Sequence, residues 1–149
     1  MSNVIDRDLG WNNIVKDIKS LDGKSVSAGI LKNAGKEPNG AKLVDVAFWN
    51  EYGTKKIPSR PFVRLSFENN KDKWGDLAEE VVADVIDKRG YTQGLKKLGN
   101  EMKNDIKSIF GDTTQLAHNA PSTRAKKKGR DEPLVDKGKL KASVNFRID

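Results

Sequence analysis

Residues 48–64 read FWNEYGTKKIPSRPFVR, the least generic stretch of the chain, and the expected fold is built outward from them. The apolar residues from Leu43 onward recur at helical spacing, which predicts a helix running into this stretch. Gly53 stands where a residue in the left-handed conformation commonly closes a helix. The sequence therefore predicts a helix that ends at Gly53.

The segment after this helix is stiffened by two prolines. Pro58 and Pro61 hold φ at about −65° and push the residue before each of them toward extended geometry. We therefore expect a rigid connector that carries Arg60 outward between the prolines. Phe62 is then expected to return to the hydrophobic core.

A companion to this stretch lies farther along the chain. Residues 118–123 read HNAPST, and after a basic run residues 133–140 read PLVDKGKL. Together with NEYGT at residues 50–54 and IPSRPFVR at residues 57–64, these motifs closely resemble the signature of the virion-morphogenesis proteins of tailed bacteriophages. That family comprises small tail-completion and neck proteins. Both motifs occur here in the order that the family shows.

The resemblance implies a structural role at the head-tail junction of a phage particle, reached from the host cytoplasm during assembly. Copies would form a homo-oligomeric ring, expected to be a hexamer, although the sequence itself does not give a copy number. The ring would contact the connector on one side and the tail tube or tail terminator on the other, with genomic DNA passing through it. One departure is Lys137, where family members usually carry Thr.

The candidate site residues fall into two sets. The motif residues expected to shape the fold or an interface are Glu51, Tyr52, Arg60, Phe62, Arg64 and Asp136. The basic residues expected to reach a neighbour from a long loop are Arg124, Lys126, Lys127, Lys128 and Arg130. Arginine on a stiff connector suits a bidentate bond to a partner's carboxylate. Equally, Arg60 could pair with Glu51 or a helical carboxylate of its own subunit.

Composition restricts the class of protein. The 149 residues fit one domain spanning residues 1–149, with a flexible N-terminus at residues 1–8. A net charge of +7 suits nucleic acid or an acidic partner, but the lysines are distributed along the whole chain. There is no cysteine, no apolar run long enough to span a membrane, and no signal-peptide pattern at the start.

Periodicity predicts an α+β fold. Helical stripes occupy residues 11–21, with Asp8 as the expected N-cap, residues 71–88 and residues 92–110, and the second could continue back to residue 63. Alternating patterns at residues 24–31 and 143–148 predict two strands that pair antiparallel, in a small sheet expected to hold one more strand. Residues 111–133 lack periodicity and are expected to form an extended basic loop.

Catalysis finds little support in the residue inventory, so we expect no enzyme and no cofactor. His118 is the only histidine and has no nucleophile or metal-spaced neighbour in the sequence. Gly23 and Lys24 imitate the end of a phosphate-binding loop, but the glycine required five residues earlier is Ile18. Two alternatives remain: non-specific binding of DNA through the basic loop, and a transient tail-assembly factor.

Overall fold

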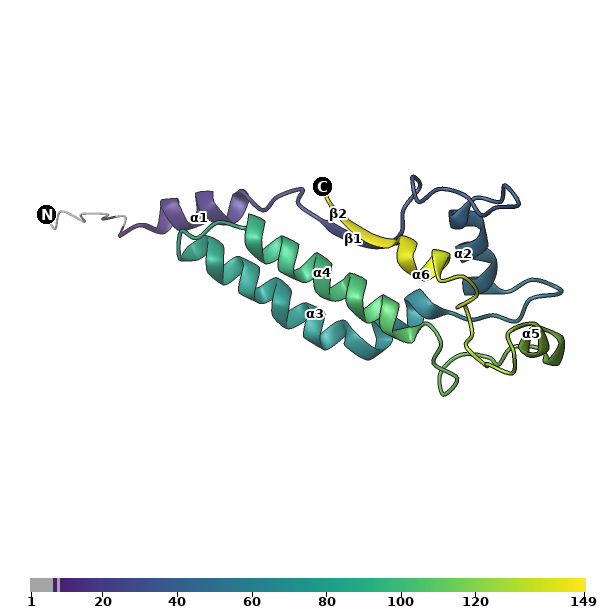
Figure 1. The fold of residues 1–149 in the computed structure, drawn as a ribbon. Helices are drawn as coiled ribbons and strands as arrows, with labels where there is room; N and C mark the ends of the chain where they lie inside the picture. Colours follow the sequence, from purple (N-terminus) through teal and green to yellow (C-terminus); the bar gives the residue numbers. More distant parts are fainter. Residues whose placement is uncertain (1–6, 8) are drawn as a thin grey trace, which may run out of the picture.

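The computed structural model describes residue 7 and residues 9–149 of the chain. Two long helices, α3 (Phe62–Ile86) and α4 (Thr92–Ile109), lie side by side and form the long axis of the molecule (Figure 1). Helix α3 is continuous from residue 62, so the two expected segments are one helix. The N-cap role expected of Asp8, and the flexible N-terminus expected at residues 1–8 apart from residue 7, lie outside the described residues.

The pairing of α3 with α4 follows from their apolar stripes. Helix α3 buries Trp74, Leu77, Val81 and Val85 on one side, as its period predicted. Helix α4 meets it with Leu95, Leu98, Ile106 and Ile109. The indole Nε1 of Trp74 donates a hydrogen bond of 2.7 Å to Asp105, which also pairs with Lys73. These polar contacts fix the register of the two helices.

A two-stranded antiparallel sheet lies along α4 (Figure 1). Strand β1 (Val26–Ile30) pairs with β2 (Val144–Ile148), and Val26 lies opposite Ile148. The sheet therefore pairs the strand that follows α1 with the C-terminal strand, and the α+β class is confirmed. The further strand expected of this sheet is not found in the described part of the chain, where residues 36 and 42 form only an isolated bridge.

Strand β2 approaches α4 very closely at one point. A Cβ atom on Gly99 would lie 2.1 Å from Cδ2 of Phe146, far inside van der Waals contact. Only glycine at this position allows the ring of Phe146 to rest on the helix backbone. Gly99 therefore sets the distance between the sheet and the helical pair.

The remaining helices gather at the two ends of the long axis (Figure 1). Helix α1 (Trp11–Lys19) contacts α3, and Asp17 forms an ion pair with Lys88. At the opposite end lie α2 (Leu43–Tyr52), α5 (Pro121–Lys126) and α6 (Lys139–Ser143). The main hydrophobic core lies at this second end and contains Leu43, Ala47, Phe62, Ile106, Ile109, Phe110, Leu116, Leu140 and Val144.

Phe62 confirms one expectation about the proline connector. Its side chain is only 1% exposed, and its ring meets Phe110 edge-on with centroids 4.9 Å apart. The first residue of α3 thus anchors the helix in the main core.

Among the described helices, none is long and apolar enough to cross a membrane.

The contact between Gly99 and Phe146 yields a stability prediction. Gly99→Ala should lower the free energy of unfolding by about 1–3 kcal/mol, because the added methyl group overlaps the ring. Gly75→Ala is the matched control: it lies on α3 with nothing near the added atom, and should be neutral or stabilise by up to about 1 kcal/mol. Urea denaturation measures both. Equal stability of the two variants would contradict the packing described.

Candidate functional site

We call residues 50–64 the first motif and residues 118–140 the second. The first motif folds around the side chain of Glu51, which is 6% exposed at the end of α2. Its two carboxylate oxygens accept hydrogen bonds from the backbone N–H groups of Val63 and Arg64, at 3.0 and 3.1 Å. Those N–H groups belong to the first turn of α3, where no residue of the helix can accept them. A negative charge is also favoured at a helix N-terminus. Glu51 therefore caps α3 from outside that helix.

The carbonyl groups at the end of α2 are satisfied by the same motif. The backbone N–H of Arg60 donates to the carbonyl of Asn50 at 2.6 Å, and Ser59 Oγ donates to that of Glu51 at 2.8 Å. Gly53 has φ of 78°, and a Cβ there would lie 2.9 Å from the backbone N of Ser59. Arg64 adds an ion pair with Glu51 at 3.1 Å. The end of α2 and the start of α3 are thus one hydrogen-bonded unit.

Arg60 does not point outward, contrary to expectation, and it does not pair with Glu51. Its side chain is buried, and its guanidinium donates to the carbonyls of Ala117 and His118 at 2.8 and 2.9 Å. Burial lowers the pKa of Arg60, and the negative charge of Asp131 partly offsets this effect. The fork of guanidinium N–H groups matches two successive carbonyls, so Arg60 ties the second motif to the first.

The extended basic loop expected at residues 111–133 is partly helical and partly buried. These residues contain helix α5, and Leu116, Asn119 and Pro133 are buried. Asp131 accepts a hydrogen bond from the backbone N–H of Asn119 and lies 2.6 Å from His118 Nδ1. These contacts hold the pKa of Asp131 below its ordinary value of 3.8.

The basic residues of this segment have different surroundings. Arg124 lies 4.0 Å from Asp131, and Arg130 lies 3.4 Å from Glu132. The ammonium group of Lys127 donates to the carbonyls of Glu132 and Val135. Within the described part of the chain, only Lys126 and Lys128 of the five have neither an ion pair nor a hydrogen-bond acceptor for their side chains. Three of these five basic side chains therefore make polar contacts with other described residues, and two do not.

Three aromatic side chains are exposed on α2 beside this unit. Phe48, Trp49 and Tyr52 are 60%, 42% and 58% exposed. The rings of Phe48 and Tyr52 lie 4.7 Å apart, and the guanidinium of Arg64 lies 5.1 Å from the Tyr52 ring. We call Phe48, Trp49 and Tyr52 the aromatic surface. Contiguous exposed apolar groups of this kind are typical of protein-protein interaction sites.

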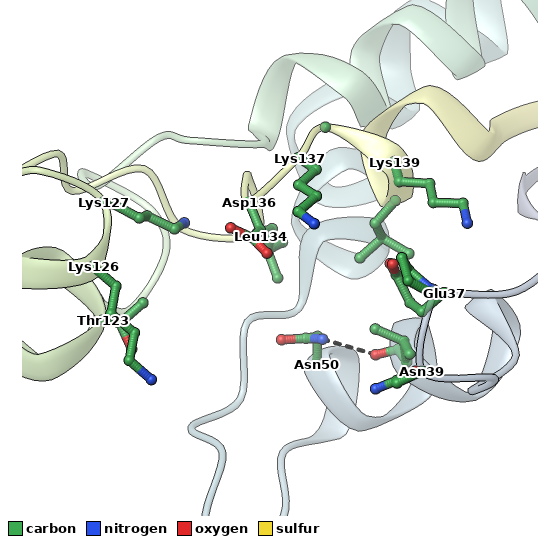
Figure 2. Close-up of a pocket in the computed structure, with 14 residues that line it drawn as sticks. Glu37, Asn39, Asn50, Thr123, Lys126, Lys127, Leu134, Asp136, Lys137 and Lys139 are labelled. Atoms are coloured by element: carbon green, nitrogen blue, oxygen red, sulfur yellow. Dashed lines mark hydrogen bonds between the residues drawn. The ribbon is translucent and has the colours of Figure 1, made fainter.

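A cavity of about 560 Å³ separates α2 from α5 and the segment before α6 (Figure 2). The first motif contributes Asn50, and the second contributes Thr123, Leu134 and Asp136 together with their neighbours. Asp136 thus lies at this cavity, away from Glu51 and Arg60. Sequence reasoning missed the residues 37–39, which supply another wall from the loop before α2, because no pattern linked that loop to either motif.

The structure therefore separates the predicted site residues into groups. Glu51, Arg60, Phe62 and Arg64 meet at the junction of α2 and α3, whereas Tyr52 faces outward. The carbonyl partners of Arg60 were not predictable, because backbone groups carry no sequence signal. In the described part of the chain, no group of three or more acidic or histidine side chains is arranged to hold a metal ion.

The cap formed by Glu51 can be tested by substitution. Glu51→Ala should lower the free energy of unfolding by about 2 kcal/mol or more, because two N–H groups of α3 and Nε of Arg64 lose their acceptor. Glu68→Ala, which removes an exposed carboxylate paired with Lys71, should change it by no more than about 0.5 kcal/mol. Thermal and urea unfolding of both variants measure the difference, and equal effects would refute the capping role.

The lowered pKa of Asp131 predicts a pH dependence. Because the folded carboxylate binds its proton less readily than the unfolded one, its contribution to stability is present above pH 3.8 and is lost as pH falls through the folded pKa. The NMR signal of the Asn119 backbone amide should report this titration with a midpoint below 3.8. A midpoint at or above that value would show that the hydrogen bond to Asn119 does not form.

Comparison of this chain with the sequence models of known families, with curated proteins and with solved structures found no match. The resemblance of its two motifs to the virion-morphogenesis proteins therefore stays a prediction from the sequence.

Proposed function

We propose that this chain is a structural protein of a tailed-phage particle, which forms a ring at the head-tail junction as a neck or tail-completion protein. The proposal begins from the two-part sequence resemblance. The observation that carries it further is that both motifs meet in one unit, through the bonds from Arg60 to the carbonyls of Ala117 and His118. The two motif segments therefore form one structural unit in this chain.

The surface around this unit supports an assembly role. The aromatic surface on α2 is formed by neighbouring residues of the first motif stretch, and none of its three side chains is needed to complete the core clusters. A ring requires each copy to offer two different surfaces, one to each neighbour. The aromatic surface is our candidate for one of them.

The alternative of non-specific DNA binding is weaker on this geometry. Three of the five basic residues around α5 lie near acids or donate to carbonyls of their own chain, which leaves Lys126 and Lys128 for phosphate contacts. Affinity for duplex DNA depends on the number of phosphates neutralised. The other alternative, a transient tail-assembly factor, differs from the proposal only in that the protein would be absent from the finished particle.

The proposal is tested by electron microscopy of the assembled particle, or of purified connector mixed with this protein. We expect a ring of density between portal and tail tube, into which copies of the chain fit. The symmetry of that density would also decide whether the ring is a hexamer. Absence of the protein from the finished particle would overturn the proposal in favour of an assembly factor or a nucleic-acid binder.

A paired substitution tests the aromatic surface in the same assay. Phe48→Ser with Trp49→Ser should reduce the yield of joined particles by about tenfold or more, because exposed aromatic side chains commonly dominate interface energy. Val82→Ser removes a side chain of similar exposure on α3 and should have no effect. Circular dichroism must show that both variants fold. An unchanged yield with the first variant would exclude this surface from the ring contacts.

A further inference from the structure

The cavity between α2 and α5 is lined by more basic than acidic side chains. Four lysines line it, Lys126, Lys127, Lys137 and Lys139, against the two acids Glu37 and Asp136. In Figure 2 the side chain of Lys137 reaches into the space above Asn50, and that of Lys126 borders it from α5. The interior of this hollow is thus positively charged and open to a ligand.

Two of these lysines build the walls and two remain available. The ammonium group of Lys127 donates to the carbonyls of Glu132 and Val135, and that of Lys139 donates to the carbonyl of Lys36. By contrast, among the described residues nothing accepts a hydrogen bond from the ammonium groups of Lys126 and Lys137. Each carries three donors. Hydrogen bonds therefore fix Lys127 and Lys139, whereas the ammonium groups of Lys126 and Lys137 are exposed and have no partner among the described residues.

The rest of the lining indicates what kind of anion fits. Val46, Leu134 and Leu140 give the cavity an apolar portion, which a bare inorganic anion would leave uncovered. Asn50 donates its amide N–H to the carbonyl of Val46, and no described residue donates to its side-chain oxygen. That oxygen can accept a backbone N–H. A peptide segment offers carboxylates, apolar side chains and backbone groups together.

Nucleic acid suits the cavity less well. A volume of about 560 Å³ accommodates a few residues of extended chain, whereas a duplex cannot enter a concavity of this size. Short acidic segments are also recognised elsewhere by clusters of basic side chains.

We propose that this cavity binds an acidic, extended segment of a partner protein, with Lys126 and Lys137 pairing its carboxylates and Val46, Leu134 and Leu140 receiving an apolar side chain. The identification of that partner as a virion component rests on the proposed function. The binding chemistry rests on the cavity alone. Because Lys127 and Lys139 already hold the walls, binding has to order the side chains of Lys126 and Lys137 but not the walls.

The test uses the full chain and a fluorescein-labelled peptide in which Glu and Leu alternate. Fluorescence anisotropy should show saturable binding that weakens as salt is raised. The same peptide with Gln in place of Glu should bind at least about tenfold more weakly, because it cannot form charge-assisted hydrogen bonds. Lys126→Gln with Lys137→Gln should weaken binding of the Glu peptide by a similar factor.

A matched control separates the cavity from the general positive charge. Lys55→Gln with Lys56→Gln removes the same charge from exposed positions outside the cavity and should leave binding unchanged. Equal weakening by both pairs, equal affinity for the Gln peptide, or no binding of the Glu peptide would each overturn the inference. Complete displacement of the peptide by duplex DNA of arbitrary sequence would also overturn it. So would the finding that the cavity is occupied by a second copy of this chain instead of the peptide.

The two proposals can fail separately. A ring seen at the head-tail junction without peptide binding would refute the cavity ligand and leave the proposed function standing. Peptide binding by a protein absent from the particle would refute the proposed function and leave the cavity ligand standing. Thermal unfolding of each lysine variant confirms that the fold is retained.

Discussion

The hydrogen bonds from Val63 and Arg64 to the carboxylate of Glu51 fix how the chain turns from α2 into α3, and the rest of the structure depends on that turn. Because the turn is fixed, Phe62 enters the main core at the first residue of α3. The same geometry directs Arg60 toward the carbonyls of residues 117 and 118. Through this link a cap on one helix determines where residues 111–133 lie.

This arrangement changes what the motif stretch means. A residue whose side chain is buried and hydrogen-bonded inside its own subunit cannot also present that side chain to a neighbour. Under the proposed function, Glu51, Arg60 and Phe62 would therefore contribute to assembly only by holding the surfaces that make contacts. Tyr52 is the motif residue whose ring faces outward. Interaction is accordingly expected from the surroundings of the motif: the aromatic surface on one side and the cavity on the other.

The sequence was informative where burial is periodic. The stripes of α3 and α4, the antiparallel strands and the end of α2 at Gly53 were all predictable, because one face of each element packs on the core. The direction of Arg60 was not predictable, since its acceptors are backbone carbonyls about sixty positions away. For the same reason residues 111–133 looked unstructured: isolated buried residues such as Leu116 and Asn119, separated by polar ones, leave no repeat to detect.

The lysines show why net charge alone says little about function here. Lys127 and Lys139 are counted in the charge of +7, yet both donate to carbonyls and so serve the fold. Lys137 differs: it stands where the resembling family usually has Thr, and it places an unpartnered ammonium group beside the cavity. Because the Lys137 side chain is exposed and has no partner among the described residues, it adds charge to the cavity without holding the fold together. Lysines of the same charge thus serve different roles, and only the surroundings of each ammonium group distinguish them.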